Sequence, residues 1–233
     1  IDATSGRNLP PLTRRDRPGR IPLSLAQQRM WFLNRLDPTS AVDNIPVALR
    51  LAGPLNLAAL ESSINDVVHR HESLRTVYPD IDGVGYQRIL RPDDVAIEFD
   101  VRSVDSDDVM VAATEFFARG FDVTSELPLR TAVMQLPNGD HVLLVVAHHI
   151  AADGFSMRPL TRDLMTAYAS RAGGEAPLWN SLPVHYADFA LWQREVLGRS
   201  DDPRSLLAEQ ERFWTQALDG YSGRVLLPTS GPR

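Results

Sequence analysis

Residues 129–157 read LRTAVMQLPNGDHVLLVVAHHIAADGFSM, and this stretch decides the fold. Two apolar runs flank the pair Asn138-Gly139, which is the strongest short signal for a tight turn between antiparallel strands. The run from Val142 to Ala147 carries only hydrocarbon side chains, which is typical of a strand buried on both faces. It ends in two histidines, with Asp153 and Gly154 following closely. The sequence therefore predicts a central hairpin with polar groups at the end of its second strand.

The rest of the chain predicts helices and further strands around this hairpin. Ser24 and Asn56 are suited to cap helices that begin near Leu25 and Leu57. By apolar spacing, helices are expected over 25–36, 57–74, 108–121, 155–168, 185–197 and 205–218, and strands over 45–53, 76–90 (a hairpin turning at 82–85) and 95–104. The predicted fold class is α/β, an α+β sandwich with a largely antiparallel sheet of about five strands and flanking helices. We expect one compact unit, with a linker or an arm that lies on the surface over residues 1–20 and an irregular tail over residues 221–233.

Composition excludes several kinds of chemistry. The 233 residues contain no cysteine and no lysine, so thiol nucleophiles, Schiff bases and phosphate-binding lysines are absent. The formal net charge of −6 offers no basic stripe for nucleic acid. No apolar run approaches the ~20 residues that span a bilayer. The first residues lack the apolar core of a signal peptide, so a cytoplasmic location is expected.

The polar groups after the buried strand form the candidate site. Alternation along a strand would place His148 and His149 on opposite faces, so one imidazole packs in the structure and the other faces a cleft. That separation also argues against a shared metal ion, and no metal site is predicted. Asp153 either caps the following helix or is a buried carboxylate paired with an arginine. Ser156 either caps that helix or hydrogen-bonds at the site.

A second polar cluster lies at the end of the helix predicted over 57–74. It comprises His69, Arg70, His71, Glu72 and Arg75. Such a run of charge usually forms a solvated face. Arg70 and Arg75 are five residues apart and lie on different sides of a helix, so only one of them can readily reach inward to a partner such as Asp153.

Four segments in order resemble the first core motifs of condensation domains, the peptide-bond-forming domains of nonribosomal peptide synthetases. They are SLAQQRMWFL (24–33), RHESLRTVY (70–78), AHHIAADGFS (147–156) and YADFALW (186–192). Members of this family are pseudo-dimers of two lobes, each similar to chloramphenicol acetyltransferase, with the site in a tunnel between them. The resemblance implies that residues 21–220 are the N-terminal lobe of such a domain, without the second lobe.

The resemblance also implies roles for the site residues. His149 is the catalytic residue, Asp153 forms a structural ion pair with Arg70 or Arg75, and His148 belongs to the structure. Gly154 permits close backbone approach and its N–H faces a developing oxyanion, with Ser156 beside it. The residues of the fourth motif, Tyr186, Asp188 and Trp192, are expected to pack the lobe. No role is expected for His69, His71, His141 and His185.

The implied reaction joins an aminoacyl thioester acceptor to an upstream aminoacyl or peptidyl thioester donor. Both substrates are attached as thioesters to the phosphopantetheine arms of carrier proteins, so no cofactor is expected to be bound by the chain itself. The implied partners are those carrier proteins and the missing C-terminal lobe, with no nucleic acid and no membrane. The opening motif is most similar to domains that accept an L-configured donor. Two alternatives are an acyltransferase of the same superfamily that uses coenzyme A and a non-catalytic domain that docks carrier proteins or tailoring enzymes. An isolated lobe is expected to be inactive.

Overall fold

The computed structural model describes residues 9–95, 97–221 and 223. The chain divides into two units, residues 12–191 and residues 1–11 with 192–233, and the boundary falls within α5 (Tyr186–Leu197). The sequence predicts one compact unit, and the structure differs from that prediction. The tail predicted over 221–233 lies outside the described residues except at Tyr221 and Gly223.

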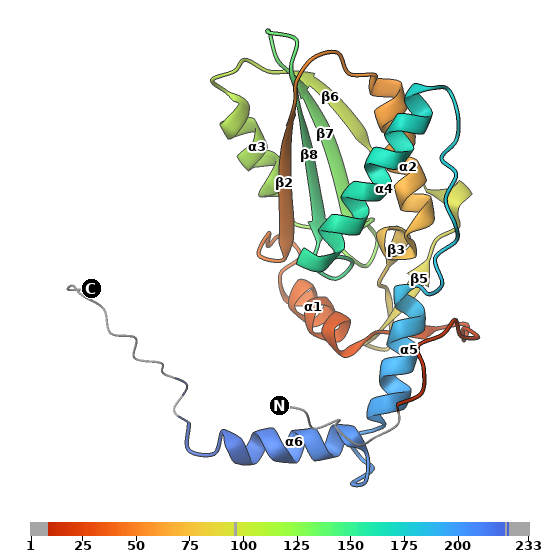
Figure 1. Ribbon diagram of the computed structural model, residues 1–233. Coiled ribbons are helices and arrows are strands. Elements are labelled where there is room, and N and C mark those ends of the chain that lie inside the picture. Colours follow the sequence, from red (N-terminus) through yellow and green to blue (C-terminus); the bar gives the residue numbers. More distant parts are fainter. Residues whose placement is uncertain (1–8, 96, 222, 224–233) are drawn as a thin grey trace, which may run out of the picture. The chain divides into compact units, whose positions relative to one another are not determined.

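A four-stranded sheet forms the centre of the larger unit (Figure 1). Its strand order is β2 (Asn44–Leu51), β8 (His141–His148), β7 (Leu129–Gln135) and β6 (Phe99–Ser103). The predicted hairpin is β7–β8, turning at Gly139 with φ +82°. Strand β2 pairs antiparallel with β8 along its whole length, from Asn44 opposite His148 to Leu51 opposite His141. This pairing places β8 inside the sheet, as its apolar run predicts.

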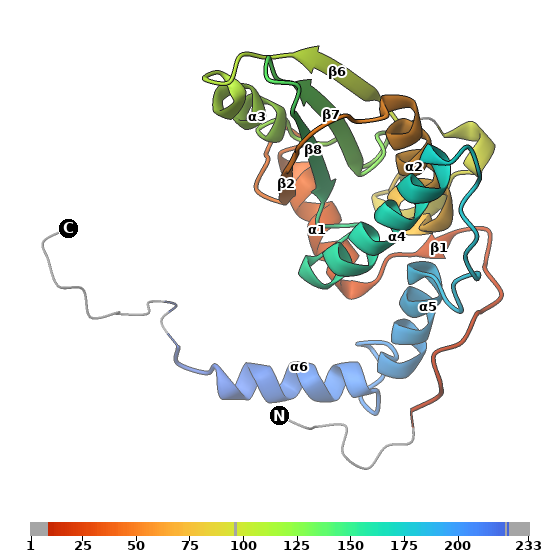
Figure 2. The same cartoon turned by 45° about the horizontal axis from the view of Figure 1, so that its top comes forward.

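Helices cover both faces of this sheet, and Figure 2 shows the same layers from another side. Helices α2 (Leu57–Arg70) and α4 (Gly154–Ala172) lie on one face, where Ile64 and Val68 of α2 share an apolar cluster with Leu143 of β8, and Leu160 of α4 packs against that cluster. Helix α3 (Val109–Phe117) lies on the other face. The connection through α3 allows β6 to pair parallel with β7, which a hairpin could not do.

A second four-stranded sheet is small. It consists of β1 (Ile21–Pro22), β5 (Val84–Ile89), β3 (Thr76–Val77) and β4 (Asp80–Ile81). The predicted turn between β4 and β5 is confirmed, with Asp82 and Gly83 both at positive φ. The prediction of a single sheet of about five strands is wrong, because the short strands after η1 (Glu72–Arg75) pair with one another and not with the central hairpin.

Side-chain caps fix the helix starts that the sequence predicts. Ser24 and Gln27 cap α1 (Leu25–Leu36) reciprocally, and Asn56 accepts from the N–H of Ala59 at the start of α2. The short helix η2 (Pro92–Asp94) precedes β6. In the smaller unit, Ser205 caps α6 (Leu206–Ala217), and Trp192 donates from its indole to the carbonyl of Pro10 at 2.7 Å. Within the described part of the chain, each helix is too short or too polar to cross a bilayer.

Candidate functional site

His148 is the last residue of β8 and is buried, with 1% of its surface exposed. Its Nδ1 accepts a hydrogen bond from the backbone N–H of Ile150 at 3.1 Å, so a neutral ring carries its proton on Nε2. The ring meets Phe121 edge to face at 5.9 Å. Burial lowers the pKa of His148 to about 4, against the opposing effect of Asp43. His148 is therefore a neutral, buried group; strand alternation predicts that one of the two histidines packs, and the structure identifies it as His148.

His149 differs from His148 in its exposure and in its position relative to the end of the strand. The strand ends at His148, so His149 is the first residue of the turn that leads to α4. Its backbone N–H donates to the carbonyl of Asp43 at 2.8 Å, while its side chain is exposed. The structure thus separates the two histidines into one packed and one solvent-facing imidazole. The catalytic role of His149 stays a prediction.

Asp153 and Ser156 form the N-terminal cap of α4. The Asp153 carboxylate accepts from the backbone N–H of Ser156 at 2.9 Å and from its hydroxyl at 2.6 Å, and the N–H of Asp153 donates to that hydroxyl at 3.0 Å. The Ser156 hydroxyl is the main cause that lowers the pKa of Asp153. Of the two roles considered for Ser156, capping is the one observed. Gly154 begins the helix, and a Cβ at this position would meet nothing within 4 Å. No close approach therefore requires a glycine there in the part of the chain described.

The predicted ion pair of Asp153 with Arg70 or Arg75 is wrong for this structure. Arg70 instead donates to Asp163 of α4 at 2.8 Å and lies over the ring of Trp179 at 4.7 Å. Arg75 lies near Glu72, 3.7 Å away, and donates to backbone carbonyls. The physical reason is that Asp153 is exposed and bonds to the first turn of its own helix, whereas Asp163 is 4% exposed and bonds to residues at the end of α2.

A signal for Asp163 is present in the sequence. Asp163 lies between Leu160, Leu164 and Ala167 at helical spacing, so it occupies an inward position of an otherwise apolar stripe. A buried carboxylate needs charged or hydrogen-bonding partners. Besides Arg70, it receives the imidazole of His71 at 2.9 Å and the guanidinium of Arg162 at 2.9 Å.

A second buried network lies under the N-terminal segment of the larger unit. Arg17 donates to Glu72 at 2.6 Å and to Asp188 at 3.3 Å. Asp188 is fully buried and also accepts from the backbone N–H of His185 at 2.8 Å. Burial alone would raise the pKa of Asp188, but hydrogen bonds from the backbone of His185 and Arg15 outweigh burial and lower it. The linker predicted over residues 1–20 is therefore held in place at Arg17.

These contacts explain part of the fourth motif. Asp188 anchors Arg17, and the Tyr186 hydroxyl lies 3.0 Å from the hydroxyl of Ser24, the residue that caps α1. Both residues pack the larger unit as predicted. Trp192 belongs to the smaller unit, where it contacts Pro10.

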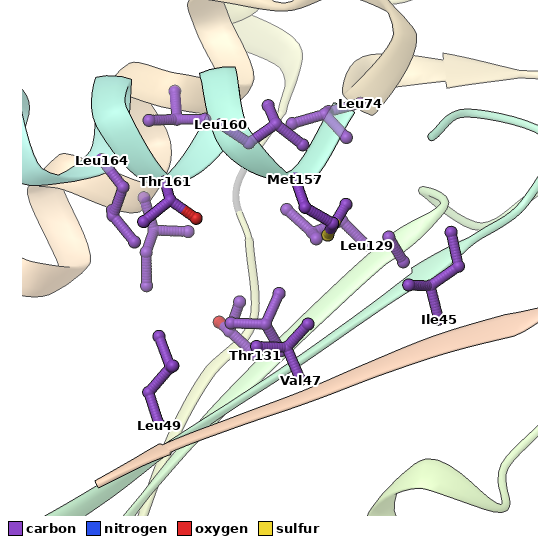
Figure 3. A pocket seen from close by; sticks show the side chains of 14 residues that line it. Ile45, Val47, Leu49, Leu74, Leu129, Thr131, Met157, Leu160, Thr161 and Leu164 are labelled. Carbon is purple, nitrogen blue, oxygen red and sulfur yellow. The ribbon is translucent and has the colours of Figure 1, made fainter. Parts of the chain in front are cut away.

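An apolar cavity of about 90 Å³ lies between α4 and the central sheet (Figure 3). One side of the cavity is lined by α4, through Met157, Leu160, Thr161 and Leu164. The opposite side is lined by two strands, through Ile45, Val47 and Leu49 of β2 and Leu129 and Thr131 of β7. The rest of the lining includes Leu74, Ala147 and further apolar residues. The hydroxyl of Thr131 is already hydrogen-bonded to the carbonyl of Glu98 at 3.2 Å. Apolar cavities of ~150 Å³ bind benzene, so this one admits a smaller aliphatic group.

This cavity adjoins the histidine motif in sequence and space. Ala147 directly precedes His148, and Met157 directly follows Ser156. No lining side chain is charged, so an ionised group would lose its hydration there without compensation. Among the residues described, no group of three or more histidine or acidic side chains could hold a metal ion.

Comparison with known sequences identifies relatives along most of the chain. Residues 18–233 match the family described as Condensation domain. The chain is 48% identical over 217 residues to a probable non-canonical nonribosomal peptide synthetase, CymA, of Salinispora arenicola, which covers 93% of this chain and 3% of that protein. It is 47% identical over 235 residues to an isonitrile lipopeptide synthase of Mycobacterium tuberculosis, which covers 99% of this chain and 9% of that protein. The chain thus spans a small part of these relatives.

Solved structures share the fold. The X-domain from teicoplanin biosynthesis is 35% identical with a TM-score of 0.85, and the match covers 96% of this chain and 49% of that one. The starter condensation domain of the rhizomide synthetase RzmA has a TM-score of 0.72 at 19% identity, over 90% of this chain and 50% of that one, and shows the fold alone. The chain spans about half of either structure. A family match from residue 18 to residue 233 and relatives near half identity show that the chain belongs to the condensation domain family.

Proposed function

We propose that this chain is the N-terminal lobe of a condensation domain and supplies one wall of a site for amide-bond formation. The observation that carries the proposal is the position of His149. Its imidazole is exposed immediately after a buried strand, while its backbone is fixed to Asp43 and its neighbour His148 is locked in place. The backbone at the end of this strand is held in place, and it presents the His149 side chain to solvent. Such an arrangement suits a catalytic side chain whose substrate lies between this lobe and a second one.

His149 has a limited role in the proposed reaction, because it is not needed to generate the neutral amine. A free α-amine has a pKa of ~8, so a useful fraction is already a neutral nucleophile at neutral pH. When the amine attacks the thioester carbonyl, the C–N bond forms and the C–S bond breaks. The nitrogen becomes strongly acidic only as the C–N bond forms. His149 takes this proton late or orients the amine, and the proton ends on the departing thiolate. Positioned proton transfer is typically worth ~10² to 10⁴-fold, and proximity can contribute ~7–11 kcal/mol.

The first turn of α4 lies close to His149 in the chain. The N–H groups of a helix N-terminus favour negative charge, so the N–H of Gly154 is the proposed donor to the oxyanion of the tetrahedral intermediate. Asp153 and Ser156 hold this turn through their cap and do not contact the reacting atoms. Their proposed role is positioning.

Carrier proteins are the proposed partners, with each substrate on a phosphopantetheine arm and no cofactor bound by the chain itself. The other wall of the site would come from the C-terminal lobe, so an isolated N-terminal lobe is expected to be inactive. The cavity under α4 would accommodate a small aliphatic part of a substrate. We also propose an L-configured donor, on the similarity of the opening motif SLAQQRMWFL (24–33) to domains of that type.

The test uses the complete two-lobed domain with carrier-bound substrates under single-turnover conditions. His149→Ala should slow amide formation by ~10² to 10⁴-fold for weakly nucleophilic acceptors and less for strong ones, because the histidine contributes mainly proton transfer. His69→Ala is the matched control, since His69 is an exposed histidine on α2 outside the site. Wild-type rates in His149→Ala with every acceptor would refute the catalytic role.

A second candidate function is the recruitment of a partner enzyme without catalysis. It is favoured by the similarity to the X-domain from teicoplanin biosynthesis, for which a complex with OxyB has been solved, at 35% identity and a TM-score of 0.87. Amide product from the wild-type domain would exclude a purely docking role. In the same assay, product from free acyl-coenzyme A without any carrier protein would indicate a coenzyme A-dependent acyltransferase.

A further inference from the structure

Arg130 of β7 is a buried arginine without a carboxylate partner among the described residues. Only 8% of its surface is exposed, and its Nε and Nη1 are buried without a hydrogen-bond partner in that part of the chain. Its Nη2 donates to the carbonyl of Arg119 at 3.1 Å and to that of Gly120. Its guanidinium carbon lies 3.7 Å from the ring centroid of Phe121. Glu126 and Glu98 act on this charge without forming an ion pair with it, and burial outweighs them. A buried charge whose contacts are carbonyls and an aromatic face is costly, which points to a role that needs the charge itself.

Phe121 connects this charge to the histidine motif. Its ring, which is fully buried, receives the guanidinium of Arg130 and also meets the imidazole of His148 at 5.9 Å with an interplanar angle of 85°. The backbone around Phe121 is fixed, because Asn34 donates to the Phe121 carbonyl at 2.7 Å. Arg130, Phe121 and His148 therefore form one continuous packed row.

The row ends at the turn that carries His149. His148 must accept at Nδ1 to hold the N–H of Ile150. If the ring gained a second proton, two donors would face each other across 3.1 Å and the turn would lose this bond. The charged groups that act on His148 are Asp43, which favours protonation, and His149 and Arg130, which disfavour it. Arg130 is the permanently charged member of the second group.

We propose that Arg130 is a positioning residue for His149. Through Phe121 it orients His148, and its charge adds to the burial that keeps the ring neutral. It thereby fixes the turn from which the His149 side chain projects. Arg130 touches no reacting atom in this arrangement. The inference deepens the proposed function, and it rests on that function only where a reaction rate is measured.

The experiment compares Arg130→Gln and Arg130→Lys in the two-lobed domain, with Arg50→Gln as the control at an exposed arginine of β2 that pairs with Asp140. Histidine rings are labelled with ¹⁵N, the His148 signal is assigned from its loss in His148→Gln, and its titration is followed by NMR. In Arg130→Gln the titration midpoint of His148 should rise measurably above the wild-type value, because a nearby positive charge is removed while the burial of the ring remains. Arg130→Lys should keep the wild-type midpoint. Arg50→Gln should change neither the midpoint nor the rate.

Rates provide the second measurement. Because a small displacement of a catalytic group can cost ~10²-fold, single-turnover amide formation in Arg130→Gln should fall about tenfold or more, with KM unchanged and partial recovery in Arg130→Lys. An unshifted His148 midpoint in Arg130→Gln would overturn the proposal, even if the rate fell. If Arg130→Gln does not fold, Phe121→Leu tests the same proposal. An unchanged His148 tautomer and an unchanged rate in that variant would overturn the proposal. A shifted midpoint combined with no effect of His149→Ala would leave the positioning role intact and refute the proposed function instead.

Discussion

Asp153 and Asp163 both belong to α4, the first as its N-cap and the second in its interior, and their surroundings are opposite in character. Asp153 lies at the exposed N-terminus, where its bonds reach only to Ser156 and the first turn. Asp163 lies in the buried middle of the helix, where it gathers Arg70 and His71 from the end of α2. One carboxylate therefore shapes the local turn beside the histidine motif, and the other joins two helices that are distant in sequence.

The difference shows that the motif aspartate need not be the residue that joins the elements. The sequence predicts that the polar cluster at the end of α2 reaches the motif directly, through Arg70 or Arg75 to Asp153. The cluster reaches α4 through Asp163 instead, on the stripe that also carries Leu160 and Leu164.

The largest effect is expected from Asp163→Asn. This change leaves the guanidinium of Arg70, whose side chain is 11% exposed, without its buried carboxylate partner. Removing one partner of a buried pair typically costs ~3–5 kcal/mol. We expect a loss of this size in the free energy of unfolding, measured by urea denaturation at pH 7.

Asp66→Asn provides the matched control for that loss. Asp66 of α2 also forms an ion pair with an arginine of α4, Arg171, at 2.7 Å. The Arg171 side chain, however, is 33% exposed. Partly exposed pairs contribute ~0–1 kcal/mol. Equal losses in Asp163→Asn and Asp66→Asn would show that burial does not distinguish the two ion pairs, and the comparison within α4 would lose its basis.

Lowering the pH is expected to have an intermediate effect on the free energy of unfolding, through the titration of His148. Burial lowers the pKa of His148 to about 4, whereas an unfolded histidine titrates near ~6.5. The unfolded state therefore binds more protons between these values, so the stability from neutral His148 is complete above pH 6.5 and is lost as the pH falls toward 4. At pH 4.5 the loss relative to pH 7 should be about 2–3 kcal/mol.

Urea unfolding at pH 7, 5.5 and 4.5 measures this loss. His71 and His185 also have pKa values lowered by burial, so they add to the same acid sensitivity. The variant His148→Asn isolates the contribution of His148, because an amide oxygen can accept from Ile150 but does not titrate. Identical pH dependence in the variant and the wild type would assign the acid sensitivity to the other histidines.

What can be predicted from the sequence is mostly local. The Asn138-Gly139 turn and the caps at Ser24 and Asn56 follow from contacts within a few residues. Strand alternation predicts that one of His148 and His149 packs and the other does not. These features depend on backbone geometry that short patterns encode directly.

The features that do not follow from the sequence depend on long-range pairing. The sequence places Arg17 in a linker or surface arm and does not identify Asp188, its buried partner, because nothing near Arg17 in the sequence indicates that residue. It gives no sign of the parallel pairing of β6 with β7, because residue alternation in β6 does not specify strand direction. It also suggests the wrong partner for Arg70, because the motif supplies a nearer candidate than Asp163. Many residue pairs are compatible with one sequence, and packing selects among them.

A smaller stability effect is expected at the motif aspartate itself. Asp153→Ala removes an exposed helix cap, and such changes typically cost about 1 kcal/mol, well below the loss expected for Asp163→Asn. Asp153→Ser should restore most of this loss, because a serine hydroxyl can accept from the same N–H of Ser156. Paired measurements of unfolding and single-turnover rate in the two-lobed domain separate the contributions. If Asp153 only positions the turn, Asp153→Ser should recover rate and stability together. A stable Asp153→Ser variant that remained slow would show that the carboxylate charge acts on the reaction, and Asp153 would then belong with His149 at the reacting atoms.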